Sequence, residues 1–332
     1  MKELLKDILR IAYMYPLKWI AWALPLRAAY FLAGVAGSIA YRLMSGKRTA
    51  FEAEAKRLPC RTEDAAGVVK RAFRNLMRHE LEVMLFPRLN PGNIDCFVGC
   101  DGLNHLDDAL KKGRGAMLLF AHFGSNQMIM PAIGHRRYAM SQLSAPATVW
   151  IEKMPNRRFS RIHKALLKMR WAHEASLPVT HINIFGSMKE AFQCLKRNEV
   201  LGIAIDGGGG KDRVTVPFLG RLARFSTGAV SIALRTGCEV LPCFMVRQGN
   251  GTHRLIIEPP IAVNAASNTE HDAVRENTMF FAKRLEEYVL KYPCHYVGFL
   301  ALRTFMEASA GDSAFFAKGE INEGIARKAA IS

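Results

Sequence analysis

The pattern of apolar and polar positions predicts alternating helices and strands along most of the chain. Apolar residues recur at helical spacing over 62–86, which predicts a long helix, and again over 103–113. Two short runs, 115–121 and 199–205, are almost entirely apolar and are typical of buried strands. Further helices are expected at 157–170, 186–198, 227–237 and 269–291, and further strands at 238–246 and 253–259.

This alternation predicts an α/β fold in which helices flank a central, mostly parallel sheet. With 332 residues, the chain is long enough to bury a large core. We divide it into an N-terminal membrane-anchoring helical segment, residues 1–60, an α/β domain, residues 61–306, and a loosely ordered C-terminal tail, residues 307–332.

The N-terminal segment is expected to contain a membrane-associated helix. Residues 19–44 are mostly apolar and long enough to reach across the apolar core of a bilayer, about 30 Å, although Pro25 and Arg27 interrupt them. Residues 1–19 place leucines and isoleucines at helical spacing beside lysines, as in a helix that lies in the headgroup layer. The alternative is a buried helical hairpin of a soluble domain. The pattern favours single-pass or monotopic attachment.

Charge and composition narrow the class of partner. The chain has 46 Lys and Arg against 29 Asp and Glu, a formal net charge of +17, which attracts anionic lipid, nucleic acid or an acidic protein. No nucleic-acid-binding motif or aromatic stacking pattern accompanies this charge, so nucleic acid is not expected. The seven cysteines are scattered without metal-ligand spacing, which indicates a reducing compartment and no metal site.

Candidate chemistry lies where two predicted strands end on polar residues, His122 and Asp206. Ligands of open α/β sheets bind outside the carboxyl ends of the strands, so reactive side chains are expected there. Gly124 and Ser125 leave room for a substrate, and Ser125 is a good N-cap for a helix whose first N–H groups would face developing negative charge. The alternative is a structural histidine with satisfied hydrogen bonds.

Two further motifs each have a functional interpretation and a purely structural one. The stretch "DGGGGKDR", 206–213, lacks the glycine and the Ser or Thr of a phosphate-binding loop, which disfavours a soluble nucleotide-binding protein. It is either a loop that lets a substrate approach the backbone or a flexible surface turn. The basic helical stretch 154–170 is either a docking surface or a solvated face. As a docking surface it would bind phosphate groups or an acidic carrier protein.

Three stretches carry a resemblance to a known family: "GLNHLDDALKKGRGAMLLFAHFG", "AIDGGGGKDRVTVPFLGRLARFSTGAV" and "KYPCHYVGFLALRTF". With them the chain resembles the lysophospholipid-acyltransferase superfamily, and in particular the late lipid A acyltransferases that add lauroyl or myristoyl chains. The similarity is collinear from the N-terminal helix to about residue 305. It implies a glycerolipid-acyltransferase-like fold with an N-terminal membrane-associated helix.

The resemblance also implies roles for individual residues. His122 corresponds to the family's general base, which removes a proton from the acceptor hydroxyl. Asp206 aligns with the aspartate of the family's Asp-Gln pair, and Gly207 replaces the glutamine. Asn156 and Arg170 align with the family's Asn and Arg downstream of the histidine. The expected catalytic set is therefore His122, Gln127 and Asp206, and the expected substrate-binding set is Gly124, Ser125, Asn126, Asn156, Arg157, Arg170, Gly207 and Arg224.

Gln127 departs from the family signature of a histidine, four residues and then Asp or Glu. A glutamine can accept a hydrogen bond from an imidazole N–H, but it cannot offset the positive charge that the ring gains as a base. Three explanations stay open. Asp206 or a residue of 80–82 takes over the role, or the acceptor is acidic enough to need less help, or the protein binds lipid without turnover.

The implied activity is transfer of a fatty acyl chain from an acyl-carrier-protein thioester to a hydroxyl of a membrane glycolipid, such as a lipid A precursor. The expected location is the cytoplasmic face of a bacterial inner membrane, and the expected partners are acyl carrier protein, anionic membrane lipid and the lipid acceptor. Because a thioester is already activated, neither a metal nor an organic cofactor is expected. The alternative is a catalytically silent relative that binds lipid or carrier protein.

Overall fold

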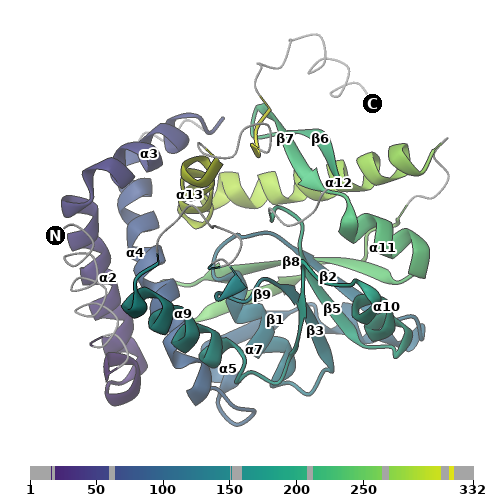
Figure 1. Ribbon diagram of the computed structural model, residues 1–332, viewed down its shortest axis with the longest axis horizontal. Helices are drawn as coiled ribbons and strands as arrows, with labels where there is room; N and C mark the ends of the chain where they lie inside the picture. Colours follow the sequence, from purple (N-terminus) through teal and green to yellow (C-terminus); the bar gives the residue numbers. More distant parts are fainter. Residues whose placement is uncertain are drawn as a thin grey trace.

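The central element of the fold is one mixed sheet between two layers of helices (Figure 1). The structure, a computed structural model, describes residues 16, 19–59, 64–149, 151, 159–207, 212–263, 269–307 and 314–317.

Seven strands form this sheet in the order β1-β9-β8-β2-β5-β3-β4. Its neighbours are parallel except for the antiparallel pair β8 and β9, and β6 and β7 form a separate antiparallel hairpin. The predicted mostly parallel sheet is therefore confirmed. The strands are β1 Val98–Asp101, β2 Ala116–Phe120, β3 Met140–Ser144, β4 Thr180–Asn183, β5 Val200–Ala204, β6 Arg213–Phe218, β7 Arg221–Ser226, β8 Glu239–Arg247 and β9 His253–Ile257.

The helices agree with the sequence pattern where that pattern is long and regular. The helix expected at 62–86 is α4, and its N-cap Asp64 accepts a hydrogen bond from the N–H of Gly67 at 2.7 Å. The α-helices are α2 Leu26–Leu43, α3 Ser45–Lys56, α4 Ala65–Leu85, α5 Ile94–Phe97, α6 Leu103–Lys111, α7 Ile129–Gly134, α9 Arg161–Glu174, α10 Lys189–Lys196, α11 Gly228–Thr236, α12 Glu270–Lys291 and α13 Val297–Glu307. The 3-10 helices are η1 Phe86–Arg88, η2 Asn126–Met128 and η3 Pro293–His295.

Strand β2 explains why the sheet needs helices on both faces. Its side chains alternate between two cores: Met117 and Leu119 pack into one, and Leu118 and Phe120 pack into the other. Helices α10, α11 and α12 contribute to the first core, and α6 and α7 contribute to the second. Since every residue of β2 is buried, the strand reads as a continuous apolar run.

The N-terminal helices pack against the α/β body. Pro25 precedes α2 and divides the apolar run predicted over 19–44. Helix α2 lies close to α4, because an added Cβ at Gly37 would come 2.5 Å from Cα of Arg74. Within the described part of the chain, none of the helices combines the length and the apolar character that a membrane crossing requires. The predicted N-terminal membrane helix is therefore unconfirmed.

Candidate active site

The register of the sheet brings His122 and Asp206 together. Strands β2 and β5 are parallel neighbours, and Phe120 lies opposite Ala204. The residue two places beyond each of these is therefore at the same height, just outside the carboxyl edge of the sheet. This is the edge at which α/β proteins of this kind bind ligands, and it places the histidine beside the aspartate.

Asp206 binds His122 through both its ring and its backbone. Nδ1 of His122 lies 2.7 Å from Oδ1 of Asp206, and the main-chain N–H of His122 donates to Oδ2 at 2.9 Å. Tyr296 donates its hydroxyl proton to the same Oδ2 at 2.8 Å. Because an ionised carboxylate only accepts hydrogen bonds, Nδ1 carries the imidazole hydrogen and Nε2 has the free lone pair. This is the tautomer that a general base requires.

The charge of Asp206 is stabilised although its side chain is buried. Burial by itself would raise the pKa of the carboxyl, but the charge and hydrogen bonds of His122 and the Tyr296 hydroxyl hold that pKa below its usual value. Burial, and then the negative charge of Asp206, raise the pKa of Tyr296 well above its ordinary value. At neutral pH the aspartate is thus ionised and the tyrosine is a protonated donor.

Tyr296 and α13 supply one wall of the site, which the sequence reasoning missed. The ring of Phe299 stacks on the His122 ring, with centroids 4.7 Å apart and an angle of 3° between the planes. Arg303 donates to the main-chain carbonyl of Asp206. Residues 296, 299 and 303 follow helical spacing in "YVGFLALR", and this spacing was the available signal. The His122 side chain keeps 41% of its surface exposed, so a substrate can reach the ring.

Gln127 belongs to a different network. Its Oε1 accepts a hydrogen bond from Nη2 of Arg170 at 3.2 Å. The same guanidinium binds Oε1 of Glu174 at 3.2 Å and also a carboxylate oxygen of Glu80. The described contacts of Gln127 therefore lead to Arg170, whereas those of the His122 ring nitrogen lead to Asp206.

The carboxylates of 80–82 are also engaged elsewhere. Glu80 pairs with Arg170, and Glu82 pairs with Arg247 in the interior. Of the replacements considered for the missing acid of the signature, Asp206 is the one that lies at Nδ1 of His122.

Comparison with known proteins gives the family. The family model described as bacterial lipid A biosynthesis acyltransferase matches residues 2–302, nearly the whole chain, including both His122 and Asp206. The chain belongs to the bacterial lipid A biosynthesis acyltransferase family. A search among curated proteins found no match. Membership in this acyltransferase family indicates acyl transfer to a lipid.

In this acyltransferase-family chain, the loop after His122 packs inward. Gly124 has φ +62°, and a Cβ there would come 1.9 Å from the carbonyl oxygen of Met245, so only glycine fits. Its N–H donates to the carbonyl of His295 at 3.0 Å and is not left to face a substrate.

Ser125 lies at the N-cap position of the helix that follows it, as predicted, but its side chain makes no capping hydrogen bond. The turn after it is the 3-10 helix η2, and the Ser125 hydroxyl accepts a hydrogen bond from Arg247 instead of an N–H of its own turn. The position of the helix start is therefore confirmed, and the side-chain cap is absent because the buried guanidinium engages the Ser125 oxygen. Ser125 is fully buried, so in this conformation it offers no surface to a substrate.

The other predicted substrate residues fall in several places. Gly207 borders the His122 ring, since an added Cβ would lie 3.8 Å from Cε1. Asn126 is half-buried at the start of η2, and Arg224 lies on β7 opposite Thr215. Substrate contacts by these residues stay predictions. The remaining predicted residues, Asn156 and Arg157, lie outside the described residues, as do positions 208–211 of the glycine-rich loop.

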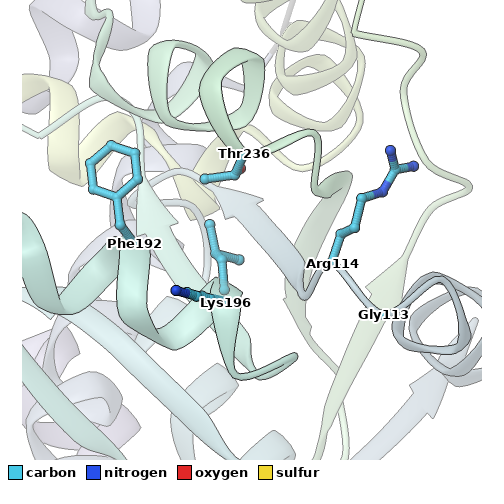
Figure 2. Close-up of a pocket in the computed structure, with 6 residues that line it drawn as sticks. Gly113, Arg114, Phe192, Lys196 and Thr236 are labelled. Carbon is cyan, nitrogen blue, oxygen red and sulfur yellow. The ribbon is translucent and has the colours of Figure 1, made fainter.

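A pocket of about 390 Å³ lies at the opposite edge of the sheet and is not part of this site. Gly113 and Arg114, which line it, precede β2, whereas His122 follows that strand, on the order of 25 Å farther along an extended chain. Figure 2 shows Arg114 extending away from Phe192. Among the residues that the structure describes, no group of three His, Cys, Asp or Glu side chains is arranged to hold a metal ion.

Proposed function

We propose that the protein transfers a fatty acyl chain from an acyl-carrier-protein thioester to a hydroxyl of a membrane glycolipid such as a lipid A precursor. The observation that carries this proposal is the exposed His122 ring, held in one tautomer by the buried carboxylate of Asp206. Family membership supplies the reaction class, and the pair supplies a base for it.

The reaction follows from the tautomer. Nε2 of His122 removes the proton of the acceptor hydroxyl as its oxygen attacks the thioester carbonyl. Asp206 stabilises the imidazolium that forms, and the tetrahedral intermediate then expels the thiolate, which takes the proton back from Nε2. Backbone N–H groups or an arginine would stabilise the oxyanion, and Arg303 is an arginine that contacts the Asp206 main chain. Because the thioester is already activated, the proposed reaction needs no metal or organic cofactor.

The acidic carrier protein fits a basic stripe on α9. Arg161, Lys164 and Lys168 are exposed and recur at helical spacing. The same helix reaches the His122 loop, because Arg170 on α9 binds Gln127. A carrier protein bound along this stripe would dock on the outer face of the helix that contacts the His122 loop, and complementary charge would speed its association.

A membrane surface fits the outer face of α2. Phe31, Val35, Ile39 and Leu43 are exposed and recur every four residues, with 68% of Phe31 and 77% of Leu43 accessible. A continuous apolar stripe on a helix marks an interaction site and suits insertion into the headgroup layer. The net charge of +17 adds attraction to anionic lipid, about 1 kcal/mol for each Lys or Arg near the surface. We place the protein on the cytoplasmic face of a bacterial inner membrane.

The hypothesis of a catalytically silent relative depended on Gln127 at the position of the family's acid. The carboxylate of Asp206 at Nδ1 of His122 supports the enzyme over this alternative, because it supplies the charge that Gln127 lacks. The test is to incubate the purified protein with radiolabelled acyl-carrier-protein thioester and a total lipid extract. A labelled lipid whose mass equals an acceptor plus one acyl chain supports transfer and identifies the acceptor. Binding of carrier protein or lipid without any labelled product would instead support the silent relative.

A further inference from the structure

A buried cluster of charges lies behind the His122 loop. Oε1 of Glu82, on α4, accepts hydrogen bonds from Nη2 of Arg247 at 2.6 Å, from Nε2 of His253 at 2.9 Å and from the Tyr30 hydroxyl at 3.2 Å. Arg247 is the last residue of β8 and is only 7% exposed. Burial would raise the pKa of Glu82, but Arg247 and His253 hold it well below its usual range. The carboxylate is thus ionised and fixes the guanidinium.

Arg247 also binds the loop that follows His122, and it does so at two points. Its Nη2 donates to Oγ of Ser125, and its main-chain N–H donates to Nε2 of His295 at 3.1 Å. The carbonyl of His295 in turn accepts the N–H of Gly124 at 3.0 Å. Both residues that follow Phe123 are therefore linked to this one arginine.

His295 can play this part because it is neutral. Burial, together with the positive charge of Arg247, lowers its pKa to about 3. Its Nε2 therefore has a lone pair at neutral pH and accepts the Arg247 N–H. Its ring stacks on Phe123 with centroids 5.3 Å apart, so it also holds the residue between His122 and Gly124.

A buried ion pair is weak evidence for stability, because the cost of desolvating two charges offsets their attraction. The definite effect of this pair is geometric. The Ser125 hydroxyl is fixed by a guanidinium that cannot move without leaving Glu82. Only two residues, Phe123 and Gly124, separate Ser125 from the His122 ring that must stay at Asp206.

We propose that Arg247, held by Glu82, is a positioning residue that keeps the His122 imidazole aligned on Asp206 through Ser125 and Gly124. The proposal rests on the proposed function in one respect, that His122 acts as the base. It adds a residue on β8 whose guanidinium reaches the site from behind the loop.

The test uses Ser125→Ala, which removes the loop's hydroxyl and leaves the Arg247–Glu82 pair intact. Its matched control is Ser141→Ala, the same change at a buried serine on β3. We expect Ser125→Ala to lower kcat of acyl transfer about tenfold, the typical effect of losing one hydrogen bond to a charged group, with KM unchanged. Ser141→Ala should leave kcat at the wild-type value.

A second measurement does not depend on activity. The Nδ1 proton of His122, identified by its disappearance in His122→Ala, is followed by NMR, and its exchange with water should be faster in Ser125→Ala than in Ser141→Ala. Equal exchange and equal kcat in the two variants would overturn the proposal. So would a lower kcat with unchanged proton exchange, because Ser125 would then act by another route. If the wild type transfers no acyl chain, the proposed function fails, while the exchange rates still decide whether Arg247 positions the ring.

Discussion

Replacing Asp206 with asparagine should remove most of the proposed activity while keeping the fold. The two side chains have the same shape, but the amide has one acceptor oxygen where the carboxylate has two. In the structure those two oxygens accept from the His122 ring, the His122 N–H and the Tyr296 hydroxyl. The amide NH2 group of asparagine must therefore face one of these donors. If it faces Nδ1 of His122, it selects the tautomer in which Nε2 carries the hydrogen, and Nε2 then cannot act as a base.

The size of the loss follows from the missing charge. The carboxylate oxygen lies 2.7 Å from Nδ1, so its charge is about 4 Å from the centre of the imidazolium that forms during the reaction. Two unit charges at about 4 Å attract by about 4 kcal/mol at an effective dielectric constant of about 20, which corresponds to about 10³-fold in rate. A fully wrong tautomer would raise the loss to about 10⁴-fold, as in serine-protease triads.

The assay is single-turnover acyl transfer from labelled acyl-carrier-protein thioester, with thermal unfolding measured on the same samples. Gln127→Asn is the matched comparison, because it shortens the amide at the position of the family's acid. We expect Asp206→Asn to lose about 10³-fold and Gln127→Asn to lose less than about tenfold, since Gln127 contacts Arg170 instead of the His122 ring. A rate of Asp206→Asn within tenfold of wild type, at an unchanged unfolding temperature, would show that the Asp206 charge does not support the base.

Three further predictions concern the networks around the site. Gln127→Glu should leave kcat within about threefold of wild type, because Arg170 already pairs with Glu80 and Glu174 and the new carboxylate gains no contact with His122. A gain of tenfold or more would instead indicate that residue 127 is the partner of the base. Acid should weaken the fold, because burial lowers the pKa of His79 to about 4 and the pKa of His295 to about 3. In the unfolded chain the pKa of histidine is about 6.5. As the pH falls, the unfolded state therefore binds these protons before the folded state does and gains stability relative to it. Urea unfolding at pH 7 and pH 5 should differ by about 2 kcal/mol for each histidine, and a free energy of unfolding that does not change between these pH values would contradict their burial as neutral groups. Phe31→Asp on α2 should reduce sedimentation with anionic vesicles severalfold, whereas Phe280→Asp, at an exposed phenylalanine of α12, should not; equal losses would show that α2 has no special part in lipid binding.

Much of the fold could be predicted from the sequence because its elements have strong local patterns. The apolar runs that became β2 and β5 and the long periodic stretch that became α4 were all identified. Strands β3 and β4 were missed, because each has only four or five residues and mixes polar with apolar side chains, as in Thr180–Asn183. The hairpin of β6 and β7 was missed because Pro217 in β6 and the arginines of β7 obscure the alternating pattern of these short strands.

In the site, too, features with a local sequence pattern could be predicted and long-range contacts could not. His122 and Asp206 could be selected because each ends a buried strand, and the parallel register then places them together. The sequence pattern alone could not pair them, since 84 residues separate them. The parts played by Tyr296 and Phe299 depend on where α13 packs, and the engagement of Ser125 depends on a guanidinium on β8. The helical spacing of 296, 299 and 303 can place these side chains on one face of a helix, but nothing in one sequence shows which surface that face contacts.

If His122 is the base of an acyl transfer to lipid, replacing it should remove the transfer. The most direct test measures labelled acyl chain transferred from the carrier-protein thioester to lipid by wild type and by His122→Ala under identical conditions. We expect a labelled lipid with wild type and a loss of at least about 10³-fold with the variant. Transfer at the wild-type rate by His122→Ala would contradict this role of His122, because the reaction would then use another base.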